Sequence, residues 1–340
     1  MSAAANDRYR LLGTLGSPYS MKLRAIMRYR RLPHDWVLRT DRNRAETEDV
    51  RPNLLPMLRY PGESHYRVDS TPLAYDLEAR HPGQRSIIPD DPGLAFLSHL
   101  LEDMADEWLT KSMFHYRWFY DADIDYASHW IADDGFPDAR GGERDAAAKQ
   151  FAERQIGRMP IVGCTPENAP VIEDSFHRIL ALLEGRVSVY DFLFGSRPSL
   201  ADFGIFGQLK TLATDPTPMA IMRAEAMKTE SWVRQLDDAS GIEGDWLVPG
   251  EDLPVAAMGL LELAGEYYLP FLLANAAAVE RGEASFSLRY ARGPYSQGTF
   301  GYQVKCLIDL RRRLGDLSGE PEERTRTILQ QTGCLDALAQ

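Results

Sequence analysis

Cysteine is scarce in this sequence. The 340 residues include three cysteines, Cys164, Cys306 and Cys334, which lie far apart along the chain. Such spacing forms neither a disulfide framework nor the C-x-x-C pair of many metal and redox sites. We therefore expect these cysteines to be small buried side chains or surface thiols without a role in chemistry.

Motifs that bind metals or nucleotides are also missing. The seven histidines never occur in H-x-x-x-H or H-E-x-x-H spacing, so no metal site is predicted. The acidic run D-A-D-I-D-Y at 121–126 is not a calcium loop, because Tyr126 and Ala132 stand where glycine and glutamate are needed. The absence of G-x-G-x-x-G, G-x-x-x-x-G-K-[ST] and G-x-S-x-G argues against a nucleotide site and a hydrolase nucleophile elbow.

Long apolar runs and an excess of positive charge are absent too. The N-terminal residues M-S-A-A-A-N-D lack the basic and apolar segments of a signal peptide. Residues 253–279 are the most apolar region, but Glu262, Glu266 and Pro270 interrupt them, which is typical of a buried helix and not of a membrane span. The net charge of -12 argues against nucleic acid or an anionic membrane as a partner. We expect a cytoplasmic protein.

Strand-like and helix-like segments alternate over residues 8–88. The apolar run Y-R-L-L-G-T-L predicts a first strand, and residues 18–31 show helical spacing. Three further strand candidates follow, D-W-V-L-R-T, P-M-L-R-Y and S-H-Y-R-V, with a turn at Pro61-Gly62 between the last two. A helix is predicted from about Thr71 to Arg80. The order is therefore β-α-β, a gap, and β-β-α.

Helical periodicity dominates after Gly93. Residues 94–119 predict one long amphipathic helix, and the acidic, glycine-containing segment 121–146 predicts a loop. Further helices are predicted at 145–158, 167–184, 200–213, 217–236, 254–281, 300–316 and 321–333. A glycine-rich, aromatic stretch at 285–301 separates two of them.

These patterns predict three regions. Residues 1–88 form an α/β domain, residues 89–240 an all-helical domain, and residues 241–340 an additional, mostly helical C-terminal portion. The segment 84–93, Q-R-S-I-I-P-D-D-P-G, is the predicted linker between the first two.

The stretch S-P-Y-S at 17–20 lies between the first strand and the first helix. Ser17 suits a helix N-cap, and Pro18 suits the first helical turn. One interpretation is a well-capped helix and nothing more. The other uses the same geometry, because a hydroxyl and free N–H groups at the positive end of a helix can hold an anion.

Four elements together resemble the soluble glutathione transferase family, with its thioredoxin-like N-terminal domain and all-helical C-terminal domain. S-P-Y-S stands where the thioredoxin-like fold has C-P-Y-C, and Pro56 stands where this branch has a cis-proline. Asp69-Ser70 matches an acidic-Ser pair before a helix, and R-P-S-L-A-D at 197–202 matches an internal capping box. The resemblance covers residues 8 to about 240.

The resemblance implies a glutathione-dependent enzyme that activates the glutathione thiol as a thiolate. Ser17 matches the family's catalytic serine or cysteine, and Tyr19 and Ser20 are alternatives, with Tyr9 a weaker one. Redox exchange is excluded because hydroxyls replace both thiols. Glutathione, the co-substrate, is expected to lie beside Leu55 and Pro56, with Asp69 at its ammonium group and Ser70 at its γ-glutamyl carboxylate.

The second substrate is expected to be a small apolar electrophile. Residues 113–120, M-F-H-Y-R-W-F-Y, are rich in aromatic side chains, and we expect Met113, Tyr116 and Arg117 to reach the cleft between the domains. The reaction could be conjugation, dehalogenation, ether cleavage or isomerisation, in a detoxification role. A non-catalytic relative that binds a ligand or another protein is the alternative. A homodimer is expected because the family forms one.

Overall fold

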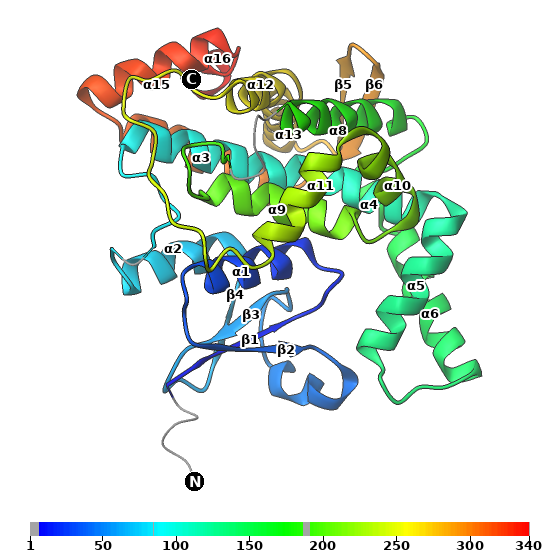
Figure 1. The fold of residues 1–340 in the computed structure, drawn as a ribbon. Coiled ribbons are helices and arrows are strands. Elements are labelled where there is room, and N and C mark those ends of the chain that lie inside the picture. The colour runs from blue at the N-terminus through cyan, green and yellow to red at the C-terminus, as the bar shows by residue number, and fades with distance from the viewer. Residues whose placement is uncertain (1–6, 84, 186–190, 340) are drawn as a thin grey trace.

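The computed structural model describes residues 7–83, 85–185 and 191–339 (Figure 1). Its first part is a four-stranded sheet with two long helices. The chain order is β1 (Tyr9–Gly13), α1 (Pro18–Tyr29), β2 (His34–Leu38), a 3-10 helix (Asp41–Thr47), β3 (Met57–Arg59), β4 (Tyr66–Val68) and α2 (Ser70–Arg80).

The strands of this sheet are in the order β2-β1-β3-β4. β1 runs parallel to β2 and antiparallel to β3, and β4 is antiparallel to β3. α1 and α2 pack on the sheet through a small core in which Leu23 and Leu73 meet Leu11 and Leu58. The thioredoxin-like architecture predicted for this region is therefore confirmed.

A single long helical run begins the second part. α3 (Pro92–Met104) continues through a π-helical turn (Ala105–Leu109) into α4 (Thr110–Phe119). The remaining helices of this part are α5 (Asp121–Gly135), α6 (Gly142–Ile156), α7 (Met159–Val162), α8 (Ala169–Glu184), α9 (Leu200–Leu212), α10 (Pro216–Glu225) and α11 (Met227–Leu236). The predicted capping box is present, because the Asp202 carboxylate accepts the N–H of Ser199 at 2.9 Å and its hydroxyl at 2.6 Å.

The prediction of a loop over residues 121–146 is wrong. Those residues form α5 and the start of α6, which pair as a helical hairpin beside the sheet (Figure 1). Asp123, Ala127 and Ala132 are buried at near-helical spacing, while Asp121, Asp125 and Asp133 are exposed. The many aspartates make the segment look uniformly polar, although one narrow row of its residues is buried. Packing of this row against α6 and α4 stabilises the helix.

The C-terminal portion contains both helices and strands. Its elements are α12 (Val255–Leu263), a π-helical turn (Ala264–Tyr268), α13 (Leu269–Glu280), β5 (Ser285–Tyr290), β6 (Gly293–Gly298), α14 (Gly301–Gly315), α15 (Gly319–Gln331) and α16 (Leu335–Leu338). The predicted helices are confirmed, but the stretch 285–301 is mostly a β-hairpin that the sequence analysis missed. Burial alternates along its strands, with Phe286 and Tyr290 inside and Ser285 and Ser287 outside.

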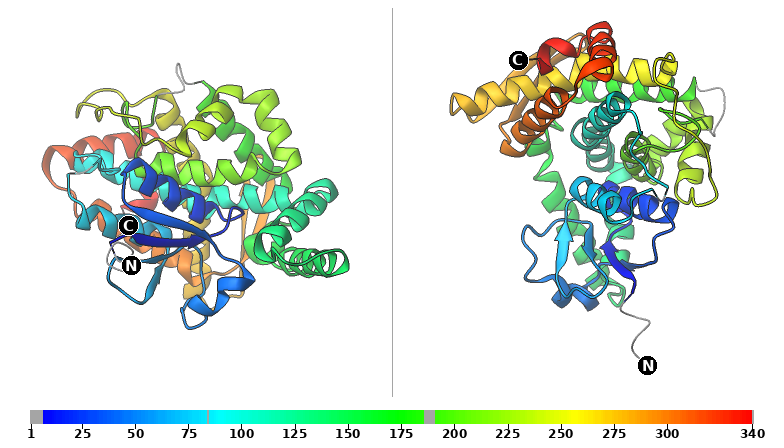
Figure 2. Two further views of the ribbon diagram at one scale, coloured as in Figure 1. Left: turned by 60° about the horizontal axis from the view of Figure 1, so that its bottom comes forward. Right: turned by 90° about the vertical axis from the view of Figure 1, so that its left-hand side faces the viewer.

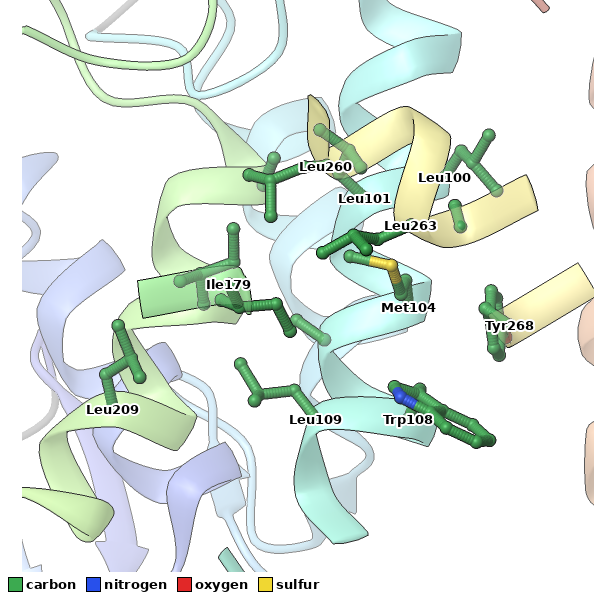
Figure 3. Close-up of a cluster of buried hydrophobic side chains, with 14 of the residues drawn as sticks. Leu100, Leu101, Met104, Trp108, Leu109, Ile179, Leu209, Leu260, Leu263 and Tyr268 are labelled. Carbon is green, nitrogen blue, oxygen red and sulfur yellow. The ribbon is translucent and has the colours of Figure 1, made fainter. Parts of the chain in front are cut away.

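The helical part and the C-terminal portion share one hydrophobic core (Figure 3). Trp108, at the π-helical turn, is 2% exposed. Its ring lies 5.6–5.7 Å from four aromatic rings of the C-terminal portion, Tyr267, Phe271, Tyr290 and Tyr295. Figure 2 (right) shows α12, α15 and α16 at the end of the molecule opposite the sheet. Residues 241–340 therefore complete the helical core and are not an appendage to it.

None of the helices in the described ranges is both long and apolar enough to cross a membrane. The three cysteines are free and buried, as expected.

Candidate functional site

Ser17 occupies the N-cap of α1. Its backbone is extended (φ -99°, ψ 115°), and its hydroxyl oxygen accepts the N–H of Ser20 at 3.2 Å. Pro18 follows at the first helical position, where its missing N–H leaves no orphan donor. The Ser17 side chain is half-buried, and in the described part of the chain its hydroxyl acts only as an acceptor. Its proton is therefore available for a ligand at the tip of the helix.

The other hydroxyls of this region point elsewhere. The Tyr19 hydroxyl donates to the Asp106 carbonyl at 2.9 Å, and burial raises its pKa well above the usual value. Ser20 is fully buried, and its oxygen accepts the Thr14 N–H at 3.4 Å. The Tyr9 hydroxyl lies 2.7 Å from His81 Nε2, at the far end of α2. Of the four candidates, Ser17 has the geometry best suited to a ligand.

Residues of the helical part contact the junction between β1 and α1. Arg117 donates to the carbonyl of Gly16 at 2.8 Å, directly before Ser17, and forms an ion pair with Asp215 (Nε–Oδ2 2.6 Å). On the neighbouring α9, Gly207 approaches α1 so closely that a Cβ there would lie 2.5 Å from the Pro18 carbonyl oxygen. The position of the helix tip is therefore set by the second part of the chain.

The residues expected to line a second-substrate pocket are buried. Met113, Tyr116 and Arg117 are 6%, 2% and 2% exposed, and all three belong to the interior of the helical part. Tyr116 packs against Phe176 at 5.1 Å between ring centroids. This burial leaves almost no surface for an electrophile and keeps the Arg117 charge paired with Asp215.

The predicted glutathione-contact residues lie at the ends of the central strand β3 and of α2. The Leu55–Pro56 bond is cis, Pro56 is buried and Leu55 is half-buried just before β3. Asp69 has a positive φ of 79° and makes no side-chain cap to α2. Its carboxylate therefore leaves the first N–H groups of α2 without a cap, although aspartate is normally a good N-cap residue. Ser70, 3% exposed, begins α2.

A buried ammonium lies beneath Ser70. Lys22 of α1, fully buried, contacts the Ser70 hydroxyl at 3.4 Å and the Thr71 hydroxyl at 3.0 Å. It also forms ion pairs with Glu102 and with Asp106, the latter at 2.6 Å. Burial by itself would lower the pKa of Lys22, but the two carboxylates outweigh it and raise the pKa. The charged network joins α1, α2 and the long helical run.

Sequence reasoning missed this network, although one signal was present. Lys22 stands between Met21 and Leu23 on the buried side of α1, and Glu102 and Asp106 are four residues apart in an apolar helix. Charged residues at buried positions are rarely left unpaired.

Two side chains of α14 also reach this region. The Tyr302 hydroxyl donates to Asp69 Oδ2 at 3.2 Å, and the Gln303 amide donates to Glu107 Oε2 at 3.1 Å. Both residues lie in the helix predicted at 300–316, but nothing in the sequence indicated that this helix contacts α2 and the π-helical turn.

Two hollows on the surface lie away from these residues. One, of about 300 Å³, lies between α5 and α6, and the other, of about 570 Å³, lies between α3, the segment 249–253 and α15. Neither is lined by a predicted site residue. In the described ranges, no group of three or more His, Cys, Asp or Glu side chains is arranged to hold a metal ion.

Comparison with known proteins identifies the first part of the chain. Residues 11–85 match the family model for the N-terminal domain of glutathione S-transferases. No protein in the curated set compared with the chain matches it.

Several solved structures are similar over much of the chain. A glutathione S-transferase from Methylobacterium radiotolerans, in complex with glutathione sulfonate, is 18% identical and covers 72% of this chain and 98% of its own, with a TM-score of 0.42. A beta-etherase from Sphingobium sp. strain SYK-6 is 17% identical, covers 68% and 97%, and has a TM-score of 0.45. A maleylacetoacetate isomerase from Anaeromyxobacter dehalogenans, with bound dicarboxyethyl glutathione, is 17% identical, covers 68% and 86%, and has a TM-score of 0.35.

The family match and the sheet order β2-β1-β3-β4 agree on the same segment. Residues 11–85 therefore form an N-terminal domain of the glutathione S-transferase type.

Proposed function

We propose that this protein is a glutathione transferase-type enzyme in which the Ser17 hydroxyl stabilises the glutathione thiolate. The observation that supports it best is the position of Ser17, a half-buried hydroxyl at the N-terminus of α1 whose proton has no partner among the described residues.

The magnitudes agree with this role. A shift of the thiol pKa from ~8.5 to about 6.5 requires roughly 2.7 kcal/mol in favour of the thiolate. One hydrogen bond to a charged group supplies about 1.5–3 kcal/mol. A helix N-terminus adds about 0.3–1 kcal/mol, and more when it is partly buried. A single hydroxyl at a helix tip is therefore sufficient.

In this proposal, the rest of glutathione lies along the starts of β3 and α2. The tripeptide lies extended beside Leu55 and Pro56. Its γ-glutamyl carboxylate meets Ser70 and the first N–H groups of α2, with the Lys22 charge beneath them. Its ammonium group meets the Asp69 carboxylate, which no cap to its own helix occupies.

The thiolate then attacks a small apolar electrophile. Conjugation, dehalogenation, ether cleavage and isomerisation all start from this nucleophile, and the proposal covers this set of reactions. We also propose a cytoplasmic homodimer, which light scattering of the purified protein would test.

The experiment compares wild type with Ser17→Ala. Calorimetry measures glutathione binding, thiolate absorbance measures the pKa of the bound thiol, and conjugation of a generic aryl halide measures turnover. We expect Ser17→Ala to bind within a few-fold of wild type, to return the thiol pKa toward ~8.5, and to lose about 10- to 100-fold in rate. Ser20→Ala is the matched control, because the Ser20 hydroxyl is fully buried and a ligand at the helix tip cannot reach it. A variant that keeps both the low pKa and the rate contradicts the role of Ser17.

A second candidate is a non-catalytic protein of the same fold that binds a ligand or another protein. The burial of Met113, Tyr116 and Arg117 favours it, because it leaves the expected electrophile pocket filled. Glutathione binding without turnover on any of the substrate classes above would support this candidate.

A further inference from the structure

The first turn of α14 lies against the start of α2. The Tyr302 hydroxyl donates to Asp69 Oδ2 at 3.2 Å, joining residues separated by 233 positions in the chain. Further along the same helices, the Arg313 guanidinium lies 4.6 Å from the centroid of the Tyr75 ring. These two side-chain contacts join α14 to α2, the helix whose N-terminus faces the proposed glutathione site.

Residues on both sides of Tyr302 in the sequence are held by hydrogen bonds. The side chain of Asn275, fully buried on α13, both donates to the Phe300 carbonyl (2.9 Å) and accepts the Phe300 N–H (2.8 Å). On the other side, Gln303 is 4% exposed and donates to Glu107. The backbone that carries Tyr302 is thus tied to α13 and to the π-helical turn. The hydroxyl at the end of this side chain is held by its bond to Asp69.

The partner of Tyr302 is equally constrained. Asp69 has φ 79°, an uncommon conformation for a residue with a Cβ, and makes no cap to α2. A carboxylate has about four lone-pair sites, so one bond from a phenol leaves acceptor capacity for an ammonium group. Burial, together with the Asp69 charge, raises the pKa of Tyr302. The phenol therefore stays a neutral donor and does not repel the carboxylate.

We propose that Tyr302 is a positioning residue of the glutathione site, which orients the Asp69 carboxylate toward the ammonium group of glutathione. The C-terminal portion, which lies outside the segment matched by the family model, would then complete the site. This inference rests on the proposed function, because it requires glutathione at Asp69.

The test separates the ammonium contact from all other effects. Calorimetry compares wild type and Tyr302→Phe with two ligands, glutathione and its deamino analogue, in which hydrogen replaces the α-amino group. We expect Tyr302→Phe to weaken glutathione binding about three- to tenfold and to change binding of the analogue by less than about twofold. In an Asp69→Asn background, Tyr302→Phe should have no further effect.

Structural damage is checked independently. Tyr302 is 42% exposed, so loss of its hydroxyl should leave the unfolding temperature unchanged, and Tyr126→Phe, at a 47% exposed tyrosine of α5, is the matched control. Equal losses for both ligands, no loss, or tighter binding of glutathione by Tyr302→Phe would each overturn the inference while the proposed function stands. A wild type that does not bind glutathione at all would overturn both.

Discussion

At the scale of the residue, the most demanding feature is the buried charge of Lys22. One ammonium group faces the carboxylates of Glu102 and Asp106 in a region where all three side chains are at most 10% exposed. Burial and the nearby Glu102 charge, opposed by Lys22, raise the pKa of Asp106 to about 7. The negative charge of these two buried carboxyl groups is therefore compensated only while the Lys22 ammonium group is present.

We expect Lys22→Met to lower the free energy of unfolding by about 3–5 kcal/mol, because it leaves buried carboxylates without their counter-charge. Urea unfolding followed by tryptophan fluorescence would measure the loss. Lys149→Met, on the exposed face of α6, is the control and should change stability by less than about 0.5 kcal/mol. Similar stabilities for the two variants would show that the network contributes little.

A second prediction concerns pH and Glu107. Burial and the neighbouring Asp103 and Asp106 charges raise the pKa of Glu107 to about 8, against the opposing effects of Gln303 and Lys111. An unfolded glutamate titrates near 4.3. Between these two pH values the folded state keeps a proton that the unfolded state has lost, so this group makes stability fall as pH rises.

Glu107→Gln should remove that loss. Since one pKa unit corresponds to about 1.4 kcal/mol, we expect the variant to be about 4–5 kcal/mol more stable than wild type at pH 8.5 and nearly equal to it at pH 4.5. Thermal unfolding across this pH range measures the difference. A constant offset between the two proteins at all pH values would contradict the assigned pKa shift.

At the scale of the element, the buried side chain of Asn168 holds the backbone of the β5–β6 hairpin. Asn168, before α8, donates to the Ser296 carbonyl at 2.7 Å and accepts the Ser296 N–H at 3.0 Å. The same amide donates to the Gly163 carbonyl at 2.7 Å. Asn168 is 1% exposed, so solvent cannot readily replace these bonds.

We expect Asn168→Ala to cost about 2–3 kcal/mol of stability, because it leaves buried backbone groups unsatisfied. Hydrogen exchange should show the loss as faster exchange along β6. Ser287→Ala, on the exposed side of β5, is the control and should be close to neutral. Unchanged protection of β6 in Asn168→Ala would show that the other contacts of the hairpin, among them the Lys111–Gln297 hydrogen bond and the aromatic packing, are enough to hold it.

At the scale of the whole molecule, the C-terminal portion is part of the folding unit. Its aromatic side chains surround Trp108, and α12 and α13 cover the long helical run (Figure 3). Removing this cover would expose a contiguous apolar surface at the centre of the protein.

A chain that ends at Gly250 is therefore expected to aggregate, or to bind a hydrophobic dye strongly and unfold without a cooperative transition. Calorimetry and dye fluorescence of the truncated and full-length chains would measure this. Cooperative unfolding of the truncated chain within a few degrees of the full-length protein would show that residues 241–340 are dispensable for the core.

The local signals of the sequence predicted much of this protein. The proline and serine at the start of α1, the capping box at Ser199 and Asp202, and the strand-helix order of residues 8–88 each depend on neighbours within a few positions. The identity of the first domain followed from them. α5 was not predicted, because its apolar periodicity is weak among many aspartates. The β5–β6 hairpin was missed although S-F-S-L-R-Y at 285–290 alternates between polar and apolar residues, a pattern typical of a strand.

The features of the candidate site also fall into those predicted from local sequence and those that depend on distant contacts. Local patterns were enough to predict the helix tip at Ser17 and the start of α2 at Asp69-Ser70, since the signals that start a helix act over a few residues. Tertiary packing buries Met113, Tyr116 and Arg117, and it brings Lys22 to Ser70 and Tyr302 to Asp69. These contacts join residues 48 and 233 positions apart, and no local preference of the chain encodes which of its surfaces will meet.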